Sequence, residues 1–173
     1  MSKPYDRACE LFAESLEQGF PPDRCHLCGA GVHEGLKGCY EAYTDLLGRE
    51  YTRPAFAAVH LYTVDAYSLQ HGELSSRGNN AVHLLRLCWL VEQDGNPHIA
   101  GGGSRWLQAW AERTEVPYLP PPARRGALTV MALAGIDDPA VYARQARAWA
   151  EAVWAAWEAH HEWARATLKS ALR

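Results

Sequence analysis

The C-terminal part of the sequence is the feature that most restricts the fold. From residue 138 to residue 173 there is no glycine, and Asp138 and Pro139 are well suited to the start of a helix. Apolar and aromatic residues then recur at helical spacing. One stripe consists of Trp149, Val153, Trp157, His160, Ala164 and Leu168. The pattern predicts one helix of about 33 residues, which is about 50 Å long.

The rest of the chain also shows helical periodicity and lacks the patterns typical of strands. Helices are expected at residues 2–18, 40–47, 54–71, 81–93, 105–112 and 129–134. The glycines at 101–103 are expected to form a connector before a helix capped by Ser104. We therefore predict an all-α fold, a bundle of four or five helices with a long C-terminal helix. One helical domain over residues 1–173 is expected, with an N-terminal helix (1–22), a knuckle loop (23–39) and a bundle (40–173).

Three of the five cysteines lie within residues 23–43, DRCHLCGAGVHEGLKGCYEAY. Cys25 and Cys28 have the spacing that lets two thiolates bind one metal ion from a tight turn, and Gly29 allows the turn. Zinc suits mixed sulfur and nitrogen ligands best. The segment therefore predicts a loop-borne Cys-x-x-Cys metal knuckle. Alternatives are unliganded thiols in a loop and a thioredoxin-like redox pair, although the strand that such a pair requires is not predicted.

The remaining ligands are expected from the two helices that follow the knuckle. These helices, 40–47 and 54–71, should pack antiparallel because their connector is short. Cys39 then lies opposite residues 63–65, between the levels of His60 and His71, which are about 16 Å apart along the axis. The knuckle precedes Cys39 and enters at the end of the hairpin that carries His71. This favours a site of Cys25, Cys28, Cys39 and His71, with His33 as the substitute if Cys39 points into the core.

Histidines on three different expected helices form a second candidate site. His60, His83 and the pair His160-His161 lie on or beside apolar stripes, and at most one of that pair faces the core. Imidazoles that converge in a bundle can hold a metal ion with an open position, which activates water. The candidate catalytic side chains are therefore His60, Asp65, His83 and His161, with Asp65 orienting a histidine. The alternative is that each histidine hydrogen-bonds a neighbour and fills space.

Charge and composition restrict the partners. The formal net charge is −3, and Arg124-Arg125 is the one adjacent basic pair, which argues against binding nucleic acid or an anionic membrane. No signal peptide is recognisable, and the longest uncharged stretches are too short to span a bilayer. We therefore expect a cytoplasmic protein with reduced thiols, in which Cys9 and Cys88 are plain buried thiols.

Several of these residues also carry a family resemblance. They are the Cys25–Gly29 knuckle, Gly38-Cys39 with Tyr43, Arg49-Glu50-Tyr51, and above all residues 59–71, VHLYTVDAYSLQH. With these motifs the chain resembles an uncharacterised bacterial family, a domain of unknown function, and the resemblance continues through residues 82–84, 126–130 and 154–161. The resemblance implies that the cysteine and histidine positions form one functional set. It does not assign an activity to the chain.

The sequence leaves more than one function open. The first hypothesis is a zinc-binding helical protein that acts as a metal-dependent enzyme on a small molecule in a His-lined pocket. The second is a non-catalytic protein with a structural zinc ion, whose Trp-rich C-terminal helix binds a partner or forms a homodimer. A third has Cys25, Cys28 and one histidine holding a catalytic zinc ion with water. Trp149, Trp154 and Trp157 are expected in the core, and lining a ligand pocket is their alternative role.

Overall fold

The structure is a computed structural model that describes residues 4–93 and 100–171. Within these ranges it contains eight α-helices, three short 3-10 helices and an isolated bridge between Arg24 and Gly31, but no strand. The elements are α1 (Pro4–Glu17), α2 (Gly35–Thr52), α3 (Pro54–Ala57), α4 (His60–Gln70), η1 (Gly72–Leu74), α5 (Arg77–Glu92), α6 (Ala100–Arg113), η2 (Val130–Leu133), α7 (Pro139–Ala156), η3 (Glu158–His160) and α8 (His161–Ala171). The all-α class is confirmed.

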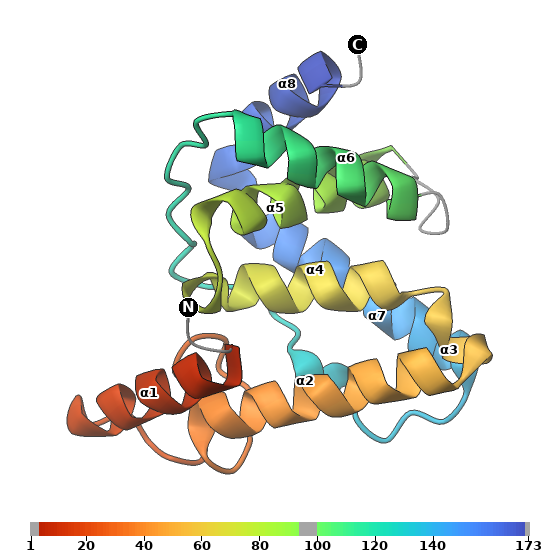
Figure 1. The fold of residues 1–173 in the computed structure, drawn as a ribbon. Coiled ribbons are helices and arrows are strands. Elements are labelled where there is room, and N and C mark those ends of the chain that lie inside the picture. Colours follow the sequence, from red (N-terminus) through yellow and green to blue (C-terminus); the bar gives the residue numbers. More distant parts are fainter. Residues whose placement is uncertain (1–3, 94–99, 172–173) are drawn as a thin grey trace.

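The helices are arranged in successive pairs around a common core. α1 packs along α2, and α2 and α4 run in opposite directions on either side of the short α3 (Figure 1). α4 packs against α5 and α7, while α5 also contacts α6 and α8. Buried apolar side chains from all eight α-helices form one cluster, which also includes Cys25 and Ala30 of the knuckle.

Several helices begin or end elsewhere than the sequence predicts. α2 begins at Gly35 rather than residue 40, so that Cys39 belongs to a helix and not to the knuckle loop. The expected helix 54–71 is divided into α3 and α4, because Val59 leaves the helical conformation at a ψ of 4°. Phe56 and Val59 are both buried, so packing accounts for this division without a helix-breaking residue. α6 begins at Ala100 and includes the glycines that were expected to form a connector.

The C-terminal segment is helical, but in two pieces. α7 starts as expected, with the Asp138 carboxylate accepting hydrogen bonds from the amides of Ala140 and Val141. The helix is interrupted at Trp157, which is 1% exposed, and resumes as α8. His161 Nε2 bonds to the carbonyl oxygen of Trp154 at 2.8 Å, and therefore satisfies an acceptor at the end of α7. His160 Nε2 bonds to the carbonyl oxygen of Pro120 at 2.9 Å. These contacts favour the break, although the sequence there contains neither glycine nor proline.

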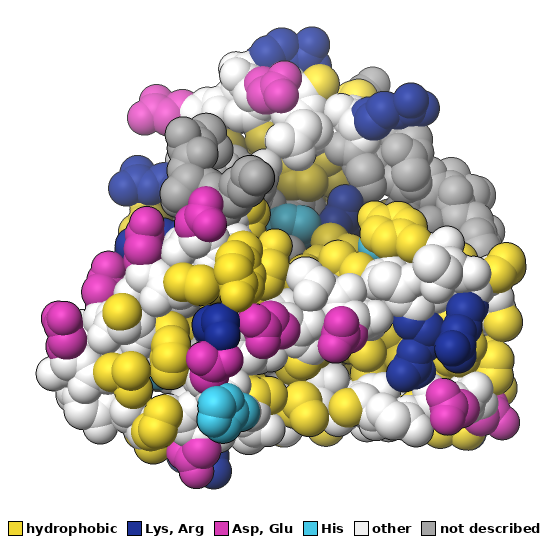
Figure 2. Space-filling model, turned by 60° about the horizontal axis from the view of Figure 1, so that its bottom comes forward, with side chains coloured by type: hydrophobic (Ala, Val, Ile, Leu, Met, Phe, Trp, Pro, Cys, Tyr) yellow, Lys and Arg dark blue, Asp and Glu magenta, His cyan; other side chains and the backbone are white. Residues whose placement is uncertain are grey.

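The surface that Figure 2 presents is mixed in charge. Lys and Arg side chains lie there in small separate groups, with Asp and Glu side chains around them. Among the helices that the structure describes, none has the length and apolar character needed to cross a membrane. The absence of nucleic-acid binding stays a prediction.

A buried amide joins α4 to the segment before η2. Gln70 is 0% exposed, and its Nε2 donates to the carbonyl oxygens of Arg125 and Leu128 at 2.7 and 2.8 Å. Its Oε1 accepts from Trp149 Nε1 at 3.1 Å. One side chain therefore holds a loop and α7 against the end of α4, next to His71.

Replacement of Gln70 by Met should lower the free energy of unfolding by roughly 2–5 kcal/mol, because two part-buried carbonyls and one buried indole N–H lose their partner. Urea denaturation monitored by circular dichroism measures the loss. The matched control is Gln18→Met, at an exposed residue, which should change stability by less than about 0.5 kcal/mol. Equal effects of the two substitutions would contradict the assigned role of Gln70.

Candidate metal centre

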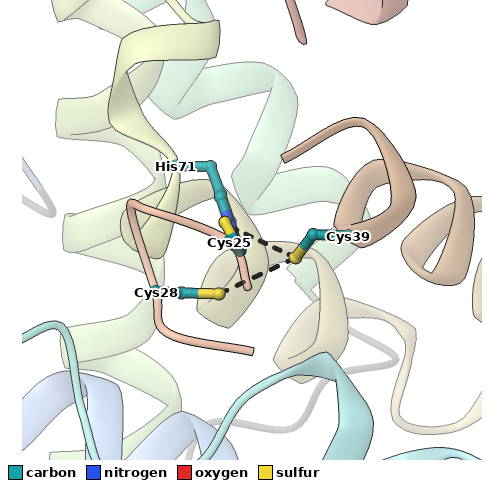
Figure 3. Close-up of side chains that lie close together, drawn as sticks. All are labelled: Cys25, Cys28, Cys39 and His71. Carbon is teal, nitrogen blue, oxygen red and sulfur yellow. Dashed lines mark hydrogen bonds between the residues drawn. The ribbon is translucent and has the colours of Figure 1, made fainter. Parts of the chain in front are cut away.

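The first two candidate ligands lie on a tight turn between α1 and α2. Cys25 N donates to the carbonyl oxygen of Ala30 at 2.9 Å, and Gly29 N donates to that of Cys25 at 2.8 Å. Gly29 has a φ of 80°, in the left-handed region that favours glycine. The turn brings the Cys25 and Cys28 side chains toward the same point (Figure 3).

The other two candidates come from helix ends that meet beside this turn. Cys39 lies in the early part of α2, and His71 directly follows α4. Gly38 permits the close approach of the chain there, since a Cβ at this position would lie 1.8 Å from the carbonyl oxygen of His33. Cys39 is 0% exposed and His71 is 1% exposed. The antiparallel course of α2 and α4 thus places both side chains against the knuckle.

The four ligand atoms lie within 4.8 Å of one another. Cys28 Sγ is 3.7 Å from Cys39 Sγ, and His71 Nε2 is 3.6 Å from Cys25 Sγ and 3.5 Å from Cys39 Sγ. Bonds to zinc are about 2.3 Å for sulfur and 2.0–2.1 Å for nitrogen, so the edges of a tetrahedral site are about 3.8 Å between two sulfurs and about 3.6 Å between sulfur and nitrogen. The three separations match these edges, and the donor set suits a zinc ion.

A hydrogen bond fixes which nitrogen of His71 faces the cysteines. His71 Nδ1 donates to the carbonyl oxygen of Tyr67 at 2.8 Å, so Nε2 is the nitrogen that can offer a lone pair to a metal ion once its own proton is displaced. The Tyr67 ring also stacks on the imidazole, with ring centroids 4.0 Å apart. The residue one turn earlier in α4 therefore orients the ligand.

The sulfur and imidazole groups shift one another's protonation. Hydrogen bonds from Cys28 and Cys39 lower the pKa of Cys25. Hydrogen bonding with Cys25 and Cys28, together with burial, raises the pKa of Cys39. Burial alone would lower the pKa of His71, but contacts with the cysteine sulfurs outweigh it and raise this pKa to about 10. At neutral pH without a metal ion, Cys39 and His71 therefore carry protons that a metal ion has to displace.

The substitute ligand of the sequence analysis lies elsewhere. The His33 side chain is 94% exposed and faces Glu34. Cys39 does not point away into the core, which was the condition for involving His33. Cys25, Cys28, Cys39 and His71 form the one group of three or more potential ligands found within the described residues.

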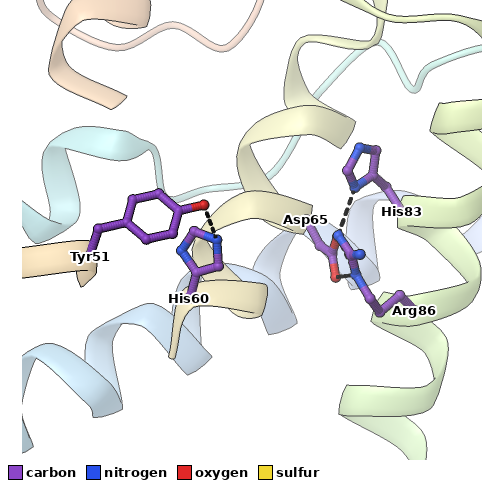
Figure 4. A network of polar contacts seen from close by, with 5 residues as sticks. All are labelled: Tyr51, His60, Asp65, His83 and Arg86. Carbon is purple, nitrogen blue, oxygen red and sulfur yellow. Dashed lines mark hydrogen bonds and ion pairs between the residues drawn. The ribbon is translucent and has the colours of Figure 1, made fainter. Parts of the chain in front are cut away.

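The histidines of the second candidate site do not converge on one point. His60 Nδ1 lies 2.8 Å from Glu50 Oε2, and its Nε2 lies 3.1 Å from the Tyr51 hydroxyl, so neither nitrogen remains for a metal ion. Figure 4 shows His60 turned toward Tyr51, while His83 is turned toward Asp65. His161 bonds to the carbonyl of Trp154 and stacks on its indole at 3.7 Å. The expected three-histidine metal site is not formed, because each ring has its own partner.

Asp65 and His83 do lie together, as part of a buried ion pair. His83 Nδ1 is 2.8 Å from Asp65 Oδ1, and Arg86 Nε is 2.8 Å from Asp65 Oδ2. Asp65 is 0% exposed, so its charge depends on both partners. Because Nδ1 donates to the carboxylate, the contact of Arg86 with the same nitrogen is a close approach rather than a hydrogen bond.

Sequence reasoning missed two charged residues of these networks. Glu50 is 2% exposed and accepts from the hydroxyls of Thr63 and Tyr142, each at 2.7 Å, besides its contact with His60. Arg86 is 7% exposed and pairs with Asp65. Glu50 lies beyond the expected helix 40–47, and the pattern of the expected helix 81–93 gave no sign that Arg86 faces inward. The partners of both come from other elements.

The fold and the cluster together define a helical protein with a Cys3His site close enough to hold a metal ion. The chain belongs to a family of unknown function, DUF5946, whose model matches residues 23–158. This confirms the resemblance to an uncharacterised family, and the matched region contains all four clustered residues. Searches among curated proteins and among solved structures found no match.

Zinc binding should weaken as the pH falls, because protons compete at Cys39 and His71, whose pKa values are raised. Because the protons of Cys39 and His71 are both displaced, the logarithm of the apparent association constant should rise by at least about 2 per pH unit between about pH 6 and pH 8. Competition with a chelator of known pH dependence measures it. A slope near zero would show that these groups are not the ligands.

Proposed function

We propose that this protein binds one zinc ion through Cys25, Cys28, Cys39 and His71, and that the ion is structural. The observation that supports the proposal is the match of three ligand separations to the edges of a zinc tetrahedron. The zinc ion would join the knuckle, the start of α2 and the end of α4. Its role is to hold the N-terminal part of the chain on the bundle.

The ligand set favours a structural ion over a catalytic one. Structural zinc sites have four protein ligands, whereas catalytic sites have three and keep one position for water or substrate. Here four side chains supply four donors, and Cys25, Cys39 and His71 are buried. A water-bound zinc ion held by Cys25, Cys28 and one histidine would leave the adjacent Cys39 sulfur without a role.

The tryptophans give little support to the expected partner surface. Trp149, Trp154 and Trp157 are 0%, 5% and 1% exposed, so they pack inside the bundle instead of forming an outer stripe. Homodimerisation and a cytoplasmic location stay predictions.

The Asp65–His83 pair favours a second candidate function, which needs no metal ion. A carboxylate that holds Nδ1–H of an imidazole leaves Nε2 as a base, and the His83 side chain is 17% exposed. This arrangement suits general base catalysis on a small molecule. This function uses Asp65 and His83 from the expected catalytic set. His60 and His161 bond to other residues and would take no direct part in it.

Replacement of Cys25 by Ser should remove the zinc ion and lower the melting temperature by about 10 °C, because metal binding contributes directly to folding in such a site. Elemental analysis should give one zinc per wild-type chain and less than about 0.2 in the variant. A cobalt-substituted sample should show the visible absorption of a tetrahedral thiolate site.

Cys9→Ser is the matched control for this substitution, because Cys9 lies in α1 outside the cluster. It should keep the full zinc content and nearly the wild-type melting temperature. A wild-type protein without stoichiometric metal, or a Cys25→Ser variant that melts with the wild type, would disprove the proposal.

Replacement of His83 by Ala should leave one zinc per chain, because His83 lies outside the Cys3His cluster. The substitution should abolish general base catalysis by the Asp65–His83 pair. Zinc content by elemental analysis separates the two functions. Loss of the zinc ion in this variant would show that His83 belongs to the same site as the Cys3His cluster.

A further inference from the structure

Three side chains lie in a row where α2 ends and α4 begins, at the opposite end of α4 from His71. Glu50 Oε2 lies 2.8 Å from His60 Nδ1, and His60 Nε2 lies 3.1 Å from the Tyr51 hydroxyl. The rings of Tyr51 and His60 are also close, with centroids 4.7 Å apart (Figure 4). A carboxylate, an imidazole and a hydroxyl are thus joined in that order, which is the arrangement of an orienting group, a base and a nucleophile.

The row passes from the interior to the surface. The Glu50 side chain is 0% exposed and the His60 side chain is 25% exposed, whereas Tyr51 is 74% exposed. The carboxylate is therefore shielded from solvent, while the phenol side chain is open to a reagent. The row thus supplies what a nucleophile and its base require, which is access for the hydroxyl and a fixed position for the imidazole.

Glu50 acts as an acceptor toward the imidazole. Its Oε1 accepts from the hydroxyls of Thr63 and Tyr142, each at 2.7 Å, which leaves Oε2 for His60. Burial raises the pKa of Tyr142, so this hydroxyl keeps its proton and remains a donor. Because a carboxylate accepts, Nδ1 of the neutral His60 ring carries the hydrogen, and Nε2 carries the lone pair that faces Tyr51.

We propose that Tyr51 is a nucleophile for acyl transfer, with His60 as its general base and Glu50 as the residue that positions His60. The substrates are activated carboxylic esters, in which the leaving group is a phenol. Tyr51 Oη attacks the carbonyl carbon, its proton moves to His60 Nε2, and the bond between the carbonyl carbon and the leaving oxygen breaks. The imidazolium gives its proton to the departing oxygen, so that the ring is neutral again.

Water completes the reaction. His60 Nε2 accepts a proton from a water molecule whose oxygen attacks the acyl carbon, and the bond from this carbon to Tyr51 Oη breaks. The carboxylic acid is released, and Tyr51 takes its proton back from His60. A phenol leaves more readily than an alcohol, so an acyl group on Tyr51 is hydrolysed more easily than one on a serine. The same property restricts the attack to esters with good leaving groups. The reaction uses none of the four metal ligands and is independent of the zinc ion.

Benzenesulfonyl fluoride tests the nucleophile in the wild-type protein, because its adduct with a phenol is stable. The phenolic oxygen replaces fluoride on sulfur, and peptide mass spectrometry locates the adduct. Tyr118 is the internal control, since it is 62% exposed and its ring faces the Arg77 guanidinium at 5.1 Å instead of an imidazole. Tyr51 should react at least about tenfold faster than Tyr118, because a positioned base contributes this much or more. A ratio below about tenfold would show that the proposal is wrong.

Variants then test the role of His60. The side chain introduced by His60→Gln is polar but cannot take up a proton, so this substitution should lower the reaction of Tyr51 to the rate of Tyr118, with the zinc content unchanged. His60→Gln and Tyr51→Phe should each lower the second-order rate constant for hydrolysis of p-nitrophenyl acetate at least about tenfold. A smaller loss in either folded variant would overturn the proposal.

The tautomer of His60 tests the positioning by Glu50. In the wild-type protein, ¹⁵N NMR of the neutral imidazole should show a protonated Nδ1 and an unprotonated Nε2. Glu50→Gln should remove this preference and slow the reaction of Tyr51 at least about tenfold, while Tyr118 reacts as before. A wild-type ring that is protonated on Nε2, or an unchanged rate of Tyr51 in Glu50→Gln, would contradict the proposal.

Discussion

Three thiols and one imidazole are held together in the interior because the end of α4 meets the start of α2. Sulfur and ring nitrogen lie 3.5–3.6 Å apart there, and three of the four residues are buried. Polar groups at such distances are unfavourable in an apolar interior unless hydrogen bonds or a shared cation satisfy them. The zinc ion proposed above would satisfy all four at once, with a positive charge that stabilises the thiolates. α1 packs on α2, so this contact is one of those that attach the N-terminal part of the chain to the bundle.

α4 directs its buried polar side chains to different neighbours. Thr63 donates to Glu50 of α2, while Asp65 pairs with His83 and Arg86 of α5. Gln70 bonds to the segment before η2 and to α7, and His71 reaches the knuckle. A shift of α4 by one residue would disrupt all of these contacts together, so they specify one position of the helix rather than merely adding stability. The same short segment carries the family resemblance.

The closeness of Cys25, Cys28, Cys39 and His71 could be predicted because it depends on local spacing and on one antiparallel hairpin. Cys-x-x-Cys spacing fixes two sulfurs, and the direction of the hairpin selects His71 over His60. The partners of His60 and His83 could not be predicted, because Glu50 and Arg86 reach them only after the helices pack. The start of α2 could not be predicted either, because it depends on Glu34, whose backbone adopts the left-handed conformation with a φ of 59°. At Trp157 the helix is interrupted by tertiary contacts, within a sequence that by itself favours a continuous helix.

The loop after His71 connects the metal centre to the start of α5. His71 fixes one end of this loop, and the Ser76 hydroxyl fixes the other by capping α5 through the Asn79 amide at 3.2 Å. Between them, the Gly72 carbonyl accepts from Asn80 Nδ2 and so determines where Asn80 Oδ1 points. A zinc ion that orders His71 would therefore also order the start of α5.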